Sequence, residues 1–121
     1  MFIEVNPNPQ NKLVGDCVIR AISIAADMPW EKAYTEVAVQ GFIMGDMPSS
    51  NSVWGAYLQN NGFRKEVCRW CGSVREFCDS HPYGTYVLAT GSHVVAVIDG
   101  NYYDTWDSGD EYPVFYFRKE N

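Results

Sequence analysis

The sequence predicts an α+β fold in which N-terminal helices pack on a C-terminal antiparallel sheet. Up to about residue 80, apolar side chains recur with the helical period, whereas from Gly84 onward the segments are short and rich in β-branched and aromatic residues. The pair Asp99-Gly100 favours a tight turn that joins two of these segments into a hairpin. At 121 residues the chain can bury its own core, so we expect a single domain over residues 1–121.

Four helices are expected in the N-terminal part, over about residues 17–26, 29–41 and 50–60 and from 73 onward. Asp16 is a favourable N-cap for the first of them, and Gly41 is the expected end of the second. Ser73 and Glu76 have the spacing of a capping box, which predicts a short fourth helix.

Four strands are expected over residues 85–89, 93–98, 101–106 and 114–118. A turn centred on Asp99-Gly100 makes residues whose numbers sum to about 199 face each other across the hairpin. This register brings His93 near Trp106 and leaves Asp104 one diagonal step away.

The overall composition excludes several classes of protein. A net charge of −6 with no cluster of basic residues argues against nucleic-acid binding. The sequence contains no signal peptide and no apolar stretch long enough to span a membrane, so we expect a cytoplasmic protein without a membrane partner. In that reducing compartment the four cysteines are expected to be thiols or ligands rather than disulfides.

Cys17 stands where the first predicted helix begins, in the segment Gly15-Asp16-Cys17. A cysteine attacks as its thiolate, which the unpaired N–H groups and the positive dipole end of a helix start stabilise. Cys17 is therefore a candidate nucleophile. The alternative is a small residue that is simply buried at a helix start.

His93 and Asp104 are the candidate partners of this thiol. His93 comes at the exposed beginning of an apolar strand, where a general base can be both rigid and accessible. Asp104 lies on the next strand and can orient the imidazole, with Asp107 as its competitor. His81, which precedes Pro82 in a turn, is the weaker candidate for the base.

An oxyanion formed during attack by the thiolate needs hydrogen-bond donors. The backbone N–H of Cys17 is one candidate, and a side-chain amide just upstream is the other. Asn11 has the natural position for that second donor, and Gln10 is the substitute.

These segments resemble papain-like cysteine peptidases, in particular compact bacterial and phage proteins related to the peptidases of double-glycine bacteriocin leaders. In that group the nucleophilic cysteine opens the central helix, as Cys17 does, and the histidine starts a core strand, as in Ser92-His93-Val94-Val95-Ala96-Val97. An Asn or Asp before a small residue and Trp completes the triad, as in Asp104-Thr105-Trp106. The phrases Gly15-Asp16-Cys17-Val18-Ile19-Arg20-Ala21-Ile22 and Tyr103-Asp104-Thr105-Trp106-Asp107 are also similar to small proteins of Gram-positive bacteria and their phages.

The resemblance implies a compact papain-like domain in a bacterial or phage-infected cell, with Cys17, His93, Asp104 and Asn11 as the catalytic residues. Two departures stand beside it. Papain-like enzymes usually place Gln before the nucleophile where this chain has Asn11, and the chain is about half as long as papain itself.

The expected function is therefore a thiol hydrolase, a cysteine peptidase or isopeptidase that acts on a peptide or protein substrate without a cofactor. The alternative from a different class is a catalytically inactive papain-like protein that binds or inhibits a host protein. Acyl transfer by the same triad is a further alternative.

A zinc site is the competing role for the remaining cysteines. The pair Cys68 and Cys71 is followed by Cys78 and His81, and together these can supply three thiolates and one imidazole to a tetrahedral ion. In the alternative, which we favour, no metal is bound and Cys78 packs beneath the fourth helix.

Overall fold

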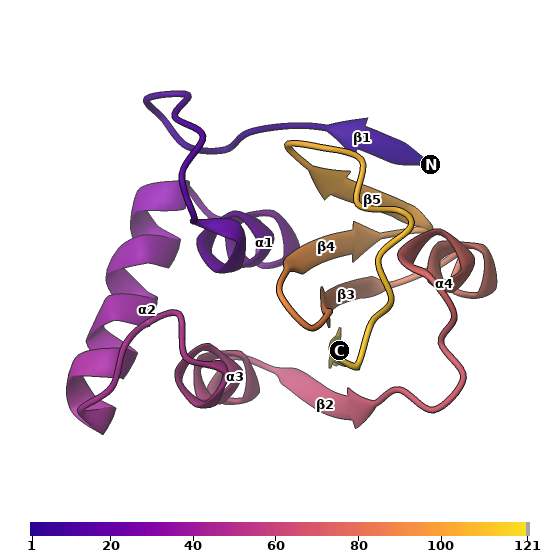
Figure 1. Cartoon of the computed structure of the whole chain (residues 1–121). Coiled ribbons are helices and arrows are strands. Elements are labelled where there is room, and N and C mark those ends of the chain that lie inside the picture. The colour runs from indigo at the N-terminus through magenta and orange to yellow at the C-terminus, as the bar shows by residue number, and fades with distance from the viewer. Residues whose placement is uncertain (121) are drawn as a thin grey trace.

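The computed structural model describes residues 1–120, which form four helices on a six-stranded sheet (Figure 1). The helices are α1 (Cys17–Ala25), α2 (Trp30–Met44), α3 (Asn51–Asn60) and α4 (Val74–Ser80). The strands are β1 (Phe2–Glu4), β2 (Phe63–Val67), β3 (Thr85–Ala89), β4 (Val94–Ile98), β5 (Asn101–Asp104) and β6 (Phe115–Lys119). The α+β class that the sequence predicts is thus confirmed.

The sheet has the order β1-β5-β4-β3-β6-β2. The β4–β5 hairpin turns at Asp99 and Gly100, whose φ angles are 49° and 78°, as a two-residue turn with left-handed central residues requires. Its register pairs Ala96 with Tyr103 and Val97 with Tyr102. Both sums are 199, so the predicted hairpin and its register are confirmed.

The helices cover both faces of the sheet (Figure 1). α1, α2 and α3 pack on one face around a core that contains Ile22, Trp54 and Phe117. The short helix α4 packs on the other face, where Phe77 and Tyr102 are fully buried. Because α1 packs against β4, its first turn comes to the end of the sheet where β4 begins and β5 ends.

The two edge strands depart from the prediction. The expected purely antiparallel sheet is mixed, because β1 pairs in parallel with β5, while β2 pairs antiparallel with β6 at the other edge. β1 has only three residues, and β2 carries Arg64, Lys65 and Glu66 in its centre. Neither has the periodic apolar pattern of a strand, because both lie at sheet edges and owe their conformation to pairing with a distant segment.

The second helix does not end at Gly41, contrary to the expectation. It continues to Met44 and ends at Gly45, whose φ of 69° is the left-handed conformation typical of a helix C-terminus. Gly41 has another role: it lets the following loop approach the helix, and the Asp46 N–H donates to the Gly41 carbonyl at 2.9 Å. A Cβ at position 41 would stand 2.7 Å from the Asp46 carbonyl oxygen.

Gly41→Ala should therefore destabilise the fold although alanine favours helix. Displacing the backbone of the loop costs about 1 to 3 kcal/mol, against a gain in helix propensity of at most about 1 kcal/mol. Urea unfolding measures the difference. Val39→Ala, at an exposed position of the same helix, is the control and should change the free energy of unfolding by about 0.5 kcal/mol or less. Equal or greater stability of Gly41→Ala would contradict this role for Gly41.

Candidate active site

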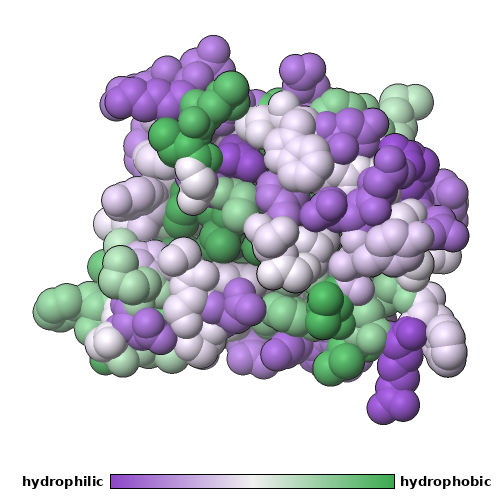
Figure 2. All heavy atoms as spheres, in the orientation of Figure 1, coloured by the Kyte–Doolittle hydropathy of each residue, from purple (hydrophilic) through white to green (hydrophobic). Residues whose placement is uncertain are grey.

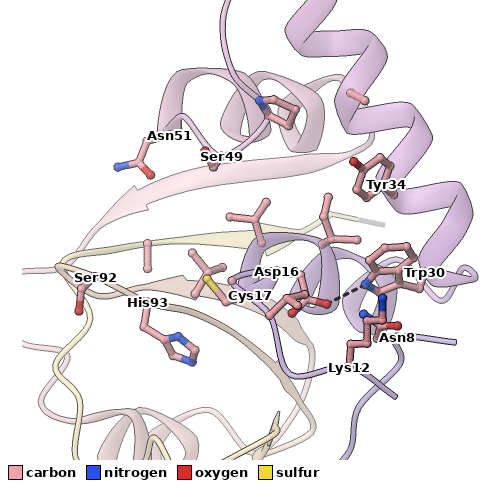
Figure 3. A pocket seen from close by; sticks show the side chains of 18 of the residues that line it. Asn8, Lys12, Asp16, Cys17, Trp30, Tyr34, Ser49, Asn51, Ser92 and His93 are labelled. Atoms are coloured by element: carbon pink, nitrogen blue, oxygen red, sulfur yellow. Dashed lines mark hydrogen bonds between the residues drawn. The ribbon is translucent and has the colours of Figure 1, made fainter. Parts of the chain in front are cut away.

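Three segments bring Cys17, His93 and Asp104 together at the end of the sheet. Cys17 is the first residue of α1, His93 immediately precedes β4, and Asp104 is the last residue of β5. Cys17 and His93 line the same cavity, and Figure 3 shows their side chains next to each other. The residues that were expected to form a triad are thus neighbours in space, although 76 and 11 positions separate them along the chain.

His93 is held from two sides. Its Nε2 lies 2.6 Å from Asp104 Oδ2, and its ring packs against Trp106 with the two ring centroids 4.8 Å apart. The bond through Nε2 leaves Nδ1 as the ring nitrogen that can serve the thiol. The expected contacts of His93 with Asp104 and Trp106 are therefore both present.

The carboxylate of Asp104 is buried, with its side chain only 2% exposed. Besides His93, its Oδ2 accepts a hydrogen bond from the Ser108 hydroxyl at 2.7 Å, and its Oδ1 accepts from the Thr105 N–H at 2.8 Å. Arg20 Nη2 lies 3.4 Å from the same Oδ1. Despite burial, which raises the pKa of Asp104, the hydrogen bonds from His93 and Ser108 lower it overall and keep the group ionised.

The thiol and the imidazole shift each other's titration in opposite directions. Burial raises the pKa of Cys17, but hydrogen bonding with His93 and with the Val94 N–H, together with the nearby charges of His93 and Arg20, brings it below its usual value. Burial lowers the pKa of His93, yet Asp104 and Cys17 raise it to about 9. A lowered thiol pKa and a raised imidazole pKa both favour a thiolate–imidazolium pair at neutral pH.

Asp107 is occupied elsewhere. Its Oδ1 accepts hydrogen bonds from the Tyr102 hydroxyl and from the Gly109 N–H, and it pairs with Arg75 at 3.4 Å. Of the two aspartates that the sequence offered as partner of His93, Asp104 is therefore the one that contacts it.

Two cavities meet at the thiol. The larger, about 720 Å³, and the smaller, about 430 Å³, are both lined by Cys17 and His93. The larger one has Val18, Ala89 and Val94 among its lining residues. Trp30 and Tyr34 form part of its wall on α2, and Figure 3 shows Trp30 beside Asp16. Figure 2 shows the same face of the molecule, with a recess that has hydrophobic residues in its depth.

Asn11, the expected side-chain donor of an oxyanion hole, is not among the residues that line the two cavities at the thiol. It is exposed, it has a φ of 54°, and its side-chain oxygen is 3.5 Å from the amide nitrogen of Asn6. Gln10, the substitute, and Asn8 do line the larger cavity. The structure thus brings Gln10 but not Asn11 to the cavity.

Asp16 occupies the N-cap position of α1 without capping it. Within residues 1–120 its carboxylate makes no capping hydrogen bond; it binds Arg20 instead and accepts a hydrogen bond from Trp30 Nε1 at 3.0 Å. The N–H groups of Val18 and Ile19, to which a capping side chain would bind, and the N–H of Cys17 before them are therefore left for an anion at the sulfur's end of the helix.

Two residues of the site were missed by sequence reasoning. Ser108 is fully buried against Asp104, and nothing in its local sequence distinguishes it from other loop serines. Arg20 did leave a signal: it is a cation in the apolar run from Val18 to Ile22, four residues after Asp16, the spacing at which helical side chains pair.

The expectation for the other cysteines is wrong in one respect. Cys68 and Cys71 form a disulfide, with their Cα atoms 5.4 Å apart, a separation that a disulfide spans readily. Cys78 lies on the buried side of α4, between the helix and the sheet, as the favoured alternative predicted. Its burial raises the pKa of the thiol to about 11. His81 stacks on Phe77 with its Nδ1 2.8 Å from the carbonyl of that residue. No cluster of three or more metal-ligating side chains forms in the described part of the chain.

No family model, curated protein or solved structure matches this chain. Among residues 1–120, no helix has the length and apolar character to cross a membrane.

Asp104→Asn should lower the pKa of His93 from about 9. The carboxylate's charge and its hydrogen bond raise that pKa, whereas burial, which lowers it, would remain; we expect a fall of about 1 to 3 pH units. An NMR titration of the imidazole measures it. Because the folded-state pKa lies above the ordinary 6.5, this interaction stabilises the fold fully below pH 6.5 and is lost as the pH rises through about 9.

Asp107→Asn is the matched control, since it removes a carboxylate of the same segment that does not contact His93. Asp107→Asn should leave the pKa of His93 unchanged. If both substitutions moved the His93 titration equally, Asp104 would not be its specific partner.

Proposed function

We propose that this protein is a thiol hydrolase with a papain-like arrangement, which cleaves an amide bond of a peptide or protein. The observation that carries the proposal is that Cys17 and His93 line the same two cavities while His93 is hydrogen-bonded to the buried Asp104. A thiol with a lowered pKa, a base held in one tautomer and a buried ionised carboxylate are what covalent thiol catalysis requires. The larger cavity beside them gives a substrate access to the sulfur.

In the first half of the reaction the Cys17 thiolate attacks the carbonyl carbon, and a carbon–sulfur bond forms while the carbonyl oxygen takes the negative charge. The backbone N–H of Cys17 at the start of α1 can donate to that oxygen. The His93 imidazolium then gives its proton to the leaving nitrogen, the carbon–nitrogen bond breaks, and the amine departs. A thioester on Cys17 and a neutral His93 remain.

In the second half, neutral His93 accepts a proton from a water molecule as that water attacks the thioester. The carbon–sulfur bond breaks, the carboxylic acid is released, and the thiolate and the imidazolium are restored. Asp104 stays ionised throughout and orients His93 through Nε2.

The site favours a polymeric substrate. Cys17 and His93 line both cavities, so a substrate chain bound at the thiol has room to occupy the two together. Leu13 and Trp106, both exposed, line the smaller cavity and offer apolar contacts there.

One observation favours the alternative of an inactive protein that binds or inhibits a partner. Asn11, the expected side-chain donor for the oxyanion, lies exposed outside the cavity. A pocket that binds a peptide without stabilising its oxyanion would hold the peptide uncleaved.

Alkylation by iodoacetamide between pH 6 and 7 tests the proposal. Cys17 should react far faster than the buried Cys78, because only the thiol of Cys17 has a lowered pKa. His93→Ala should slow the reaction of Cys17 by about tenfold or more. His81→Ala is the control, since that histidine packs beside α4 and should leave Cys17 reactive. Equal reaction of Cys17 and Cys78 would refute the hydrolase.

Cleavage of a fluorescence-quenched peptide library separates the hydrolase from the binding protein. We expect the wild-type protein to cleave members of the library and Cys17→Ala to lose at least about 10³-fold of that activity. Binding of the same peptides by both proteins, with cleavage by neither, would leave the binding role.

A further inference from the structure

Arg20 is a largely buried cation at the edge of the smaller cavity. Its side chain is 8% exposed, and it lies on α1 one turn beyond Cys17, at the position four residues after Asp16. A guanidinium cannot give up its charge inside a protein, so burial of Arg20 requires compensating acceptors around it. The groups that supply them show what the side chain does.

Those acceptors belong to two segments: the residues just before Cys17 and the end of β5. Nη1 of Arg20 binds Asp16 Oδ1 and lies 3.4 Å from the carbonyl oxygen of Val14, in the loop that leads into α1. Nη2 lies 3.4 Å from Asp104 Oδ1, at the end of β5. The planar fork of the guanidinium thus bridges the start of the helix that carries Cys17 and the strand that carries the partner of His93.

Asp16, which binds Arg20, also contacts the wall of the larger cavity. Asp16 Oδ2 accepts the hydrogen bond of Trp30 Nε1 at 3.0 Å, the contact drawn as a dashed line in Figure 3. The titratable groups along this path are Asp16, Arg20, Asp104, His93 and Cys17, and in the thiolate–imidazolium state their charges alternate in sign.

Arg20 supplies a charge that His93 cannot supply continuously. During hydrolysis His93 passes from imidazolium to neutral imidazole and back. In its neutral stage Arg20 would be the one cation, among residues 1–120, that pairs with the buried Asp104 carboxylate. A permanent cation keeps Asp104 ionised through that stage, and its fixed geometry restricts rotation of the carboxylate.

We propose that Arg20 is a positioning residue of this site, which holds Asp16 and Asp104 on one guanidinium and so fixes the orientation of His93 relative to Cys17. This role rests on the proposed thiol hydrolase and deepens it. Arg20 touches no reacting atom in this assignment and acts through Asp104.

The test compares Arg20→Lys and Arg20→Met with the wild-type protein by two readouts. The first is the rate of Cys17 alkylation by iodoacetamide from pH 4 to 9, expressed per amount of folded protein. The second is the downfield proton resonance of the His93 N–H that is bonded to Asp104. Arg20→Met should react about tenfold more slowly at pH 6, and its resonance should broaden as Asp104 becomes free to rotate.

Arg20→Lys separates charge from geometry. Lysine keeps a cation but cannot fork to two carboxylates, so the pH dependence of alkylation should stay near that of the wild type while the His93 resonance still broadens. If Arg20→Met does not fold, the double substitution Asp16→Asn with Arg20→Met removes a buried charge of each sign and provides the same measurement.

Arg75→Met is the matched control, because Arg75 also pairs with two aspartates, Asp107 and Asp110, away from the thiol. It should leave both readouts unchanged. Folded Arg20 variants with the wild-type alkylation profile and the wild-type resonance would overturn the proposal and leave Arg20 a stabilising residue only. A wild-type protein that alkylates Cys17 no faster than Cys78 would instead overturn the hydrolase itself.

Discussion

A carboxylate that is withdrawn from water must be surrounded by donors and cations, and Asp104 meets this requirement with four groups, two from distant segments and two from the loop that follows it. Arg20 comes from α1, His93 from the segment before β4, Thr105 gives a backbone N–H, and Ser108 gives a hydroxyl from the loop after β5. None of these contacts can be lost without leaving part of the buried charge unsatisfied. The requirements of Asp104 therefore fix the mutual positions of the segments around the thiol.

The start of α1 shows how one side chain can be diverted from its usual local role. Asp16 stands where an aspartate commonly caps a helix, yet it binds Arg20 and Trp30. The helix gives up a capping interaction, which is commonly worth about 1 kcal/mol. In exchange the buried Arg20 is compensated, and the first-turn N–H groups remain next to Cys17.

Local signals account for the parts of this structure that the sequence predicts well. The Asp99-Gly100 turn, the Ser73 capping box and the apolar strands each depend on neighbours within a few residues. From them the proximity of His93 and Asp104 follows through the hairpin register. These features can be predicted because the interactions that form each of them lie within the same short segment of sequence.

The features that the sequence does not predict depend on distant partners. β1 and β2 become strands by pairing with β5 and β6. Residues 46–48 approach the helix closely at Gly41, and a disulfide closes the Cys68–Cys71 loop. Ser108 and Asn11 are ordinary loop residues until the fold places one beside a buried carboxylate and the other in solvent. The composition and spacing of the sequence do not predict such positions.

The two-residue turn between β4 and β5 limits how the sequence can vary in proteins that keep this hairpin and its site. His93 and Asp104 lie on opposite arms of one hairpin, so the number of residues between them is part of the site. Exchange of one turn residue for another that accepts positive φ leaves the register intact. A single insertion or deletion there would slip β5 by one residue and reverse the face that each of its side chains presents. Such sequences can therefore diverge at the turn in identity but not in length.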